Sequence, residues 1–257
     1  MHRFFCPQAD FSLTELILTD KNEIHHIHNV LRLQKADEIF VFDGKGKEAK
    51  GKISAISAKS VTIEIISHEH IKKNTPTIIL ACAIPKKGKF ELIIEKATEL
   101  GVDEIYPIKT HRTEIILDKK RADKKTNRYQ MVAINAAKQS KRPTIPRIHP
   151  ITPFNDAIKE LTQNSTVIIP SLLGKRKNLI TALNELKSPQ TISFFIGPEG
   201  DFTEEEYGNA QKQGCIPVTL GETILRVETA AISVIACTNS FFAHDHIAAP
   251  QENRLWR

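Results

Sequence analysis

The chain has 257 residues, of which 40% are hydrophobic and 26% are charged, and its formal net charge is +6. These values predict a globular protein of one large or two modest domains. They exclude a helical membrane protein, because no apolar run reaches the ~20 residues that span a bilayer. The opening segment MHRFFCPQAD also lacks the apolar core of a secretion signal, so we expect a cytoplasmic protein without a membrane partner.

Basic residues are concentrated in the middle of the chain. Residues 73–150 hold 17 basic and 8 acidic side chains, whereas residues 1–72 hold ten of each and residues 151–257 hold nine and twelve. A concentrated positive stretch favours a polyanionic partner such as nucleic acid. A solvated lysine-rich surface would give the same counts, so charge alone does not decide between them.

The first 72 residues are expected to form mostly β-structure. EIFVFDGKG (38–46) ends in a turn signal, and polar and apolar residues alternate at 50–57 and 60–69. One helix is expected after Asp20, where apolar residues recur at helical spacing. This pattern predicts a small antiparallel barrel over 1–72, and the polar segment 68–76 is expected to be a linker.

From residue 77 onward, strand and helix patterns alternate. Helices are expected at 89–101 and 121–142, and Thr203 with Glu206 forms a capping box that begins a later helix. Short apolar strands are expected at 77–85, 104–110, 165–172, 191–197 and 216–221. Such alternation implies crossover connections, so residues 73–257 are predicted to form an α/β domain with a mostly parallel sheet.

Three strand ends in this domain are candidate ligand loops: IIPSLLG (168–174), IGPEGDF (196–202) and LGETILRVETA (220–230). Ligands of open α/β sheets bind beyond the carboxyl ends of the strands. Glycines in the last two loops would let a flat ligand approach the backbone, although ordinary turn chemistry also uses glycine. Neither GxGxxG nor GxxxxGK[ST] is present, which disfavours a standard phosphate-binding loop.

Arg226 breaks a local rule. It lies just before an expected helix, where a cation opposes the helix dipole at a cost of about 0.3–1 kcal/mol. Such a violation at a strand–helix junction is typical of a functional site. A salt bridge from Arg226 to Glu222 or Glu228 would explain it equally well.

No metal site is expected. His25, His26 and His28 lie on one expected helix, but their spacing does not place three ligands on one face. The four cysteines stand apart without a CxxC motif, which is typical of buried free thiols rather than of a zinc site or a disulfide framework.

Taken together, six motifs resemble a known family. The motifs are HIHNVLRL, FDGKG, KFELIIEKATELGV, AAKQSKR, IGPEG and LGETILRVETA, and they occur in family order and at family spacing. The chain resembles the RsmE-type 16S ribosomal RNA (uracil-N3)-methyltransferases of the SPOUT class. It departs from the family pattern at Ala36 and Asp201, where glycine is usual, and at Lys138, where glutamate is usual.

The resemblance implies a PUA-like RNA-binding barrel (1–72) and a SPOUT methyltransferase domain (73–257) with a deep trefoil knot. It also implies a homodimer, S-adenosylmethionine as the methyl donor, and 16S ribosomal RNA of the small subunit as the substrate. The implied cofactor-binding residues are Pro170, Leu172, Ile196, Gly197, Pro198, Glu199, Gly200, Leu220, Gly221, Ile224, Leu225, Arg226 and Thr229.

For catalysis, Arg226 would stabilise negative charge on the uracil oxygens or anchor a phosphate. Glu199 and Glu228 are alternative proton acceptors. RNA contacts are expected from Arg3, Arg32, Arg112, Lys141 and Arg142. Two other functions remain open: a SPOUT enzyme that methylates the ribose 2′-oxygen of transfer or ribosomal RNA, and a non-catalytic RNA-binding assembly factor.

Overall fold

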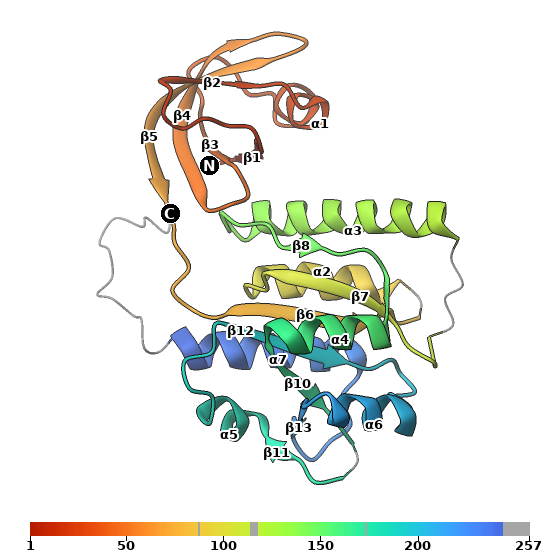
Figure 1. Ribbon diagram of the computed structural model, residues 1–257. Coiled ribbons are helices and arrows are strands. Elements are labelled where there is room, and N and C mark those ends of the chain that lie inside the picture. The colour runs from red at the N-terminus through yellow and green to blue at the C-terminus, as the bar shows by residue number, and fades with distance from the viewer. Residues whose placement is uncertain (87, 114–117, 173, 244–257) are drawn as a thin grey trace. The chain divides into compact units, whose positions relative to one another are not determined.

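The computed structural model describes residues 1–86, 88–113, 118–172 and 174–243 (Figure 1). The chain divides into two compact units. The first contains Met1–Lys72 and also Ala133–Ile145, and the second contains Lys73–Val132 and the chain from Pro146 onward. Ala133–Ile145 thus belongs to the first unit, although the predicted boundary between residues 72 and 73 places it in the second domain.

The first unit is built on a five-stranded sheet with the order β1-β3-β4-β5-β2. Its strands are β1 (Arg3–Phe5), β3 (Glu38–Phe42), β4 (Lys47–Ile56), β5 (Val61–His70) and β2 (Glu15–Leu18). All neighbours are antiparallel except β1 and β3, which are parallel. The mainly antiparallel prediction is therefore confirmed, but β5 continues to His70, so the first part of the expected linker is strand.

A short helical segment covers this sheet, as predicted. It consists of α1 (Lys21–His25) and the π-helical turn η1 (His26–Val30). The Asp20 carboxylate caps α1, because its Oδ1 accepts hydrogen bonds from the backbone N–H groups of Asn22 (2.9 Å) and Glu23 (3.0 Å). The apolar side of the segment packs into the core of the unit.

Ala133–Ile145 joins the first unit through a buried ion pair and a bridge. Lys138 Nζ lies 2.7 Å from Glu23 Oε2, and the two side chains are only 13% and 9% exposed. Gly44 and Thr144 form a β-bridge, and the Gly46 N–H donates to the Pro143 carbonyl (3.2 Å). Such pairings between distant segments leave no periodic signal, which is why the sequence pattern did not reveal them.

The second unit contains an eight-stranded sheet in which every pairing is parallel. The strand order is β11-β13-β10-β12-β6-β7-β8, and β9 pairs with β7. The strands are β6 (Thr77–Ala83), β7 (Glu104–Lys109), β8 (Arg147–Ile148), β9 (Thr152–Pro153), β10 (Thr166–Pro170), β11 (Lys177–Asn178), β12 (Thr191–Ile196) and β13 (Ile216–Thr219). The predicted parallel α/β fold is thus confirmed.

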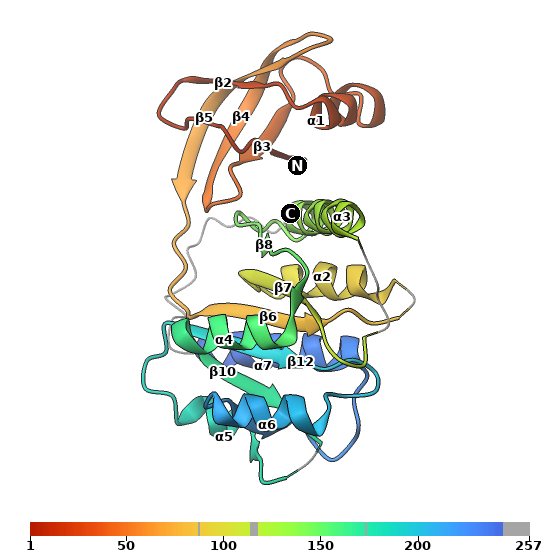
Figure 2. The ribbon, with the colours of Figure 1, turned by 45° about the vertical axis from the view of Figure 1, so that its right-hand side comes forward.

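Helices cover both faces of this sheet (Figure 2). Helices α4 (Phe154–Asn164) and α6 (Glu204–Lys212) pack on the face that contains Ile79, Ala81 and Ala83. Helix α7 (Val227–Ala243) contacts β6 and β12 and packs against α2 (Lys89–Glu99) and α5 (Leu179–Asn184). The remaining helix, α3 (Lys119–Gln139), runs from the second unit into Ala133–Ile145.

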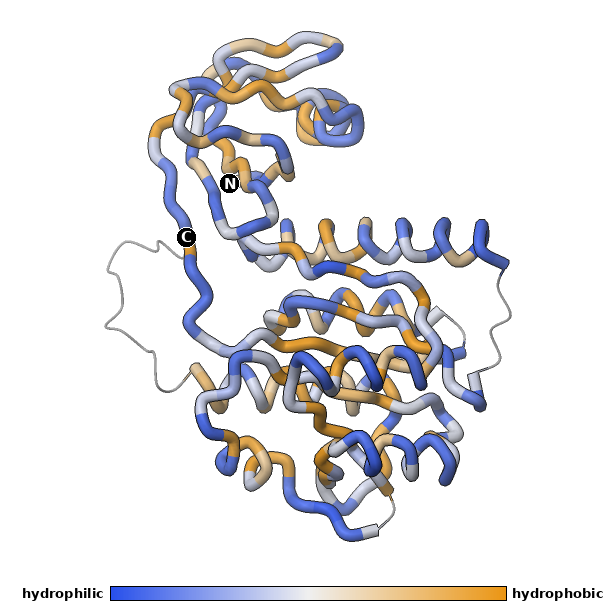
Figure 3. The backbone as a smooth tube through the Cα atoms, in the orientation of Figure 1, coloured by the Kyte–Doolittle hydropathy of each residue, from blue (hydrophilic) through white to orange (hydrophobic). Residues whose placement is uncertain are grey.

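The hydropathy of the backbone follows this layering. The central strands β6, β10 and β12 are mainly apolar, whereas much of α3, α4 and α6 is polar (Figure 3). Residues 78–84 of β6 and its extension are all at most 6% exposed, as expected of a strand covered on both sides. Among the described helices, none is both long enough and apolar enough to cross a membrane.

Candidate active site

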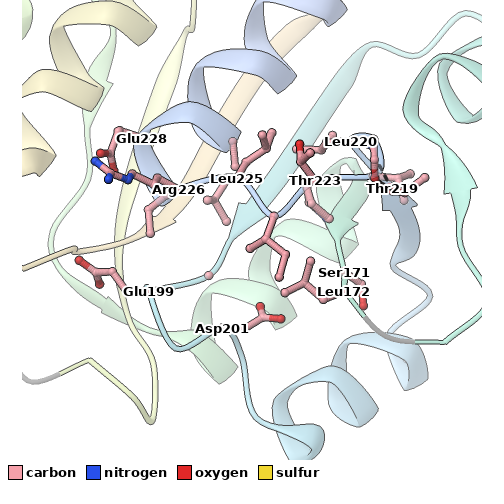
Figure 4. Close-up of a pocket in the computed structure, with 18 of the residues that line it drawn as sticks. Ser171, Leu172, Glu199, Asp201, Thr219, Leu220, Thr223, Leu225, Arg226 and Glu228 are labelled. Carbon is pink, nitrogen blue, oxygen red and sulfur yellow. Dashed lines mark hydrogen bonds between the residues drawn. The ribbon is translucent and has the colours of Figure 1, made fainter.

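A cavity of about 480 Å³ lies at the carboxyl ends of β10, β12 and β13 (Figure 4). All three predicted loops contribute to its wall. It is lined by most of the residues that the resemblance implied for the cofactor: Pro170, Leu172, Ile196, Gly197, Pro198, Glu199, Leu220, Gly221, Ile224, Leu225 and Arg226. The two others, Gly200 and Thr229, do not line it. Gly200 instead presents its carbonyl to Arg112, and Thr229 is exposed in the first turn of α7.

The wall also contains residues beyond those that the resemblance implied individually for the cofactor: Lys89, Ser171, Arg176, Asp201, Val218, Thr219, Glu222, Thr223, Val227 and Ala230. Six of them lie within the three predicted ligand loops: Ser171, Asp201, Glu222, Thr223, Val227 and Ala230. Arg176, Val218 and Thr219 lie within two positions of a predicted loop, whereas Lys89 is remote from all three and carries no such signal. Arg176 reaches the site by donating from Nη1 to the Ser171 carbonyl (2.7 Å).

The loop after β12 is shaped by its own contacts. Asp201 has a left-handed backbone (φ 62°), the region in which glycine is usual and aspartate is tolerated. Its Oδ1 accepts hydrogen bonds from the Phe202 N–H and the Tyr207 hydroxyl, both at 2.8 Å. A Cβ on Gly197 would lie 3.0 Å from Asp201 Oδ1, a tight contact that would require the Asp201 side chain to shift, so the loop itself favours glycine there. Gly197, which was expected to let a ligand approach the backbone, therefore also makes room for the Asp201 side chain within the loop.

Gly221 has a different reason to be glycine. Its φ of +137° is a conformation that side chains of L-residues rarely adopt, while no atom lies within 4 Å of the position that a Cβ would occupy. The requirement is thus conformational and leaves open space beside the backbone at the cavity wall.

Lys89 and the carboxylates of Glu199 and Glu228 line the cavity. Lys89 Nζ donates to Glu228 Oε1 at 2.7 Å. This hydrogen bond, followed by one from the Glu228 backbone N–H, lowers the pKa of the Glu228 carboxyl. On the opposite loop, Glu199 Oε1 accepts a hydrogen bond from the Lys86 N–H (3.0 Å). Lys89 and Glu228 thus form an ion pair with each other, whereas the Glu199 carboxylate has a backbone N–H as its partner.

Arg226 is exposed, and within the described part of the chain its guanidinium has no hydrogen bond or ion pair. Figure 4 shows it beside Glu228, with no interaction drawn between the two side chains. The salt bridge that the sequence left open, from Arg226 to Glu222 or Glu228, is therefore not formed. The Arg226 donors remain available to a ligand.

Of the five residues predicted to bind RNA, Arg3 has a buried side chain, which contradicts an RNA contact there. Arg3 Nη2 lies 2.5 Å from Glu48 Oε2, and the two side chains are 7% and 9% exposed. Its guanidinium also lies 5.1 Å from the centre of the Phe42 ring. The Arg3 side chain thus lies in the interior of the first unit. Its positive charge compensates the buried Glu48 carboxylate, which would be strongly destabilising without a partner.

The other four predicted RNA residues remain at or near the surface. Arg112 is engaged within its own unit, since Nη1 donates to the Gly200 carbonyl and so holds the loop after β12. Arg32 and Lys141 are both exposed and have left-handed backbones (φ 53° and 56°). Arg142 donates from Nε to Thr144 Oγ1 (2.8 Å).

Within the described ranges, no group of three or more His, Cys, Asp or Glu side chains is arranged to hold a metal ion. His25 instead interacts through Nδ1 with the Asn29 amide (2.8 Å). Cys6, Cys82 and Cys215 are buried as expected, whereas Cys237 is exposed on α7.

Comparison with known proteins identifies the family. Residues 72–239 match the family model of an RNA methyltransferase domain, and residues 18–66 match that of an RNA methyltransferase PUA domain. The ribosomal RNA small subunit methyltransferase E of Bacillus subtilis is 32% identical over 219 residues, which cover 83% of this chain and 86% of that protein. The chain belongs to the ribosomal RNA small subunit methyltransferase E family.

Other proteins are similar over even more of the chain. The protein of Mesomycoplasma hyopneumoniae is 33% identical over 91% of this chain and 97% of its own length. The crystal structure of the Neisseria gonorrhoeae enzyme bound to S-adenosyl methionine is 31% identical, with a TM-score of 0.83 and coverage of 94% and 98%. A Legionella pneumophila methyltransferase in complex with the same cofactor has a TM-score of 0.81 at 28% identity, with coverage of 93% and 96%. The family resemblance and the PUA-like first unit are thereby confirmed.

Proposed function

We propose that the protein transfers a methyl group from S-adenosylmethionine to N3 of a specific uridine in 16S ribosomal RNA. The observation that carries this proposal is the cavity at the ends of β10, β12 and β13, formed by three loops of a methyltransferase E chain. Two similar structures have the same cofactor bound. The identity of the relatives as small subunit enzymes supports 16S RNA as the substrate.

The residues of the cavity fit this cofactor. Its volume of about 480 Å³ lies within the roughly 300–1,000 Å³ that is usual for small-molecule sites. Leu172, Ile224 and Leu225 supply apolar surface for a flat ring, and Glu199 and Glu222 supply negative charge for a sulfonium. When bound, the cofactor contributes an electrophilic methyl group. We propose the thirteen residues implied by the resemblance as its binding site, with Gly200 and Thr229 as outer supports.

Arg226 is the residue that we propose acts on the uracil. The uracil N3–H must lose its proton before or during transfer, which leaves negative charge on the ring oxygens. A guanidinium without a protein partner stabilises that charge at no cost of breaking an ion pair. Anchoring of a substrate phosphate is the alternative role.

Glu199 and Glu228 are the candidate proton acceptors. The lowered pKa of Glu228 makes its carboxylate a weaker base, because Lys89 and the backbone N–H stabilise the ionised form. Glu199 lies on the loop after β12, and its Oε1 accepts only a backbone hydrogen bond among the contacts described. We therefore favour Glu199 as the proton acceptor.

The domain roles, the knot and the dimer are further parts of the proposal. We propose residues 1–72 as the PUA-like RNA-binding domain and residues 73–257 as the SPOUT methyltransferase domain, with RNA contacts from Arg32, Arg112, Lys141 and Arg142. The family resemblance supports a deep trefoil knot made by the loops that line the cavity. Because the substrate is ribosomal, we place the protein in the cytoplasm.

Helix α7 supports the homodimer. Glu228 is its only charged residue between Val227 and Ala243, yet positions such as Cys237 are exposed. A helix that is apolar on nearly all sides is usually buried, so a second copy of the chain is a suitable cover.

Nucleoside analysis of 16S RNA from a deletion strain tests the function. We expect loss of N3-methyluridine and its return with the wild-type gene. Retention of N3-methyluridine in the deletion strain would refute the proposal. Loss of a 2′-O-methylated nucleoside instead would identify a ribose methyltransferase, and failure to bind S-adenosylmethionine in calorimetry would indicate a non-catalytic assembly factor.

A further inference from the structure

Lys89 occupies an unusual position beside the cavity. It is the first residue of α2, and its ammonium group pairs across the fold with Glu228, 139 positions away, at 2.7 Å. A cation in the first turn of a helix opposes the helix dipole, so α2 gains no stability from lysine at this position. The Lys89 side chain is 35% exposed and that of Glu228 is 16% exposed, so the pair lies at the cavity wall rather than in the core.

Glu228 has a second cation within reach. Arg226 lies two residues before it, and the charge of Arg226 contributes to the electrostatic field at its carboxylate. A guanidinium and a carboxylate so close would ordinarily form a bidentate pair. Glu228 instead receives hydrogen bonds from Lys89 and from its own backbone N–H. Arg226 lies beside this carboxylate without a hydrogen bond or ion pair to it among the described contacts.

The state of Arg226 depends on this arrangement. A guanidinium paired bidentately with a carboxylate has two of its five N–H donors occupied and its charge largely neutralised, so its contact with a substrate oxygen would stabilise less negative charge. An unpaired guanidinium makes the same contact directly, which is the preorganisation that favours a charged transition state.

We propose that Lys89 is a positioning residue: by holding Glu228, it keeps Arg226 unpaired and directed at the substrate. This inference rests on the proposed function, in which Arg226 contacts the uracil or its phosphate. Lys89 itself does not touch the reacting atoms. Its effect on methyl transfer requires the presence of the Glu228 carboxylate, and this requirement distinguishes it from a direct or purely structural role.

A double-mutant cycle tests the inference. Single-turnover methylation of small-subunit particles is measured at saturating S-adenosylmethionine for Lys89→Met, Glu228→Gln and the double variant. We expect Lys89→Met to slow transfer at least tenfold in the wild-type background, because Glu228 then pairs with Arg226. In the Glu228→Gln background the same change should alter the rate less than about twofold.

Two variants serve as controls. Lys89→Arg keeps the cation and should retain most of the rate. Lys96→Met lies on the same helix and removes an ammonium that pairs with Glu95 and Glu99 outside the cavity wall, so it should transfer at the wild-type rate. If Lys89→Met unfolds, as its melting temperature would show, Lys89→Gln is used in the same cycle.

Equal losses in both backgrounds, or a wild-type rate for Lys89→Met, would overturn the role of Lys89 while leaving the proposed function intact. A wild-type protein that forms no N3-methyluridine would overturn the proposed function and this inference with it. A rate in the double variant that matches Glu228→Gln alone would support it.

Discussion

Ala36 holds a backbone conformation that suits glycine better than alanine. Its φ is 79°, and its N–H donates to the Ile53 carbonyl at 2.8 Å, so the turn cannot relax without losing this bond. The left-handed region costs an L-residue about 1–2 kcal/mol, whereas glycine loses about 0.5–1 kcal/mol more conformational entropy on folding. We expect Ala36→Gly to raise the free energy of unfolding by about 0.5–1 kcal/mol.

Urea unfolding measures this change as a higher midpoint at an unchanged slope. Ala58→Gly is the matched control, because Ala58 is exposed and is not among the residues with positive φ. There we expect a loss of stability. A loss at both positions would contradict the strain assigned to Ala36.

Arg226→Ala should separate catalysis from folding. The side chain has no ion pair in the described structure and directly precedes α7, whose dipole it opposes. We expect an unchanged or slightly higher melting temperature, with kcat and kcat/KM reduced together by about 10²–10³. Melting, cofactor affinity and single-turnover methylation would be measured side by side. A much lower melting temperature, or lost cofactor affinity with normal turnover of the bound fraction, would assign Arg226 to structure or to cofactor binding.

The Glu104–His149 contact predicts a dependence of stability on acid. His149 Nε2 lies 2.5 Å from Glu104 Oε2, and this hydrogen bond holds the pKa of Glu104 below its ordinary value. A carboxyl whose pKa is lowered by folding stabilises the protein above its unfolded pKa, and that stability is lost as pH falls through the folded pKa. Glu104→Gln should therefore flatten the fall of unfolding free energy as pH drops below the ordinary glutamate pKa of about 4.3. An acid limb identical to wild type would contradict this.

At the scale of the element, α3 carries the basic excess that the sequence shows. Its first turn contains no acidic residue, and Lys120, Lys124 and Arg128 follow one another at four-residue spacing. Like charges at this spacing destabilise a helix by about 0.2–0.5 kcal/mol per pair, and cations in the first turn oppose the dipole. Because these clustered positive charges destabilise α3 on their own, we infer that they serve to bind a polyanion such as RNA.

We therefore expect the triple variant Lys119→Gln, Lys120→Gln and Lys124→Gln to weaken RNA binding without lowering the melting temperature. Each lost phosphate contact should reduce the slope of log K against log salt by about 0.7–0.9. The control triple replaces the exposed Lys159, Lys187 and Lys212 by Gln and should keep the wild-type slope. Equal slopes for the two triples would locate the RNA elsewhere.

Elements with strong periodicity could be predicted from the sequence, and pairings between them could not. Helices α2 and α3 begin within two residues of the expected positions, and the capping box of Thr203 and Glu206 is present at the start of α6. The two-residue strands β8, β9 and β11 are too short to show alternation, so they were missed. Their presence depends on neighbouring strands rather than on local propensity.

At the scale of the whole molecule, some parts of the cavity could be predicted from the sequence and others depend on how distant elements pack. The loops after β10, β12 and β13 could be predicted as ligand loops, because glycine and proline interrupt apolar strands there. Lys89 could not, since its place in the wall depends on how α2 packs against α7. The burial of Arg3 with Glu48 could not be predicted for the same reason, because the sequence does not show which distant residue a charged side chain pairs with.

The composition of the first unit leads to a last prediction about the chain as a whole. A fragment of residues 1–72 contains the whole five-stranded sheet but lacks Lys138, the partner of the buried Glu23 carboxylate. Removing one member of a buried pair costs about 3–5 kcal/mol, because the remaining charge stays desolvated. We expect the fragment to be largely unfolded, and Glu23→Gln within it to recover part of the lost stability.

Circular dichroism and urea unfolding of the 1–72 fragment, with and without Glu23→Gln, measure this recovery. In the full-length chain, Lys138→Met should destabilise the first unit in hydrogen exchange, and adding Glu23→Leu should restore most of the protection, since two apolar residues can replace a buried ion pair. A fragment 1–72 that folds stably whether or not Glu23 is charged would show that Ala133–Ile145 is dispensable to the first unit. Recovery confined to the Glu23 variants would show instead that the N-terminal unit is completed by a segment from the middle of the chain.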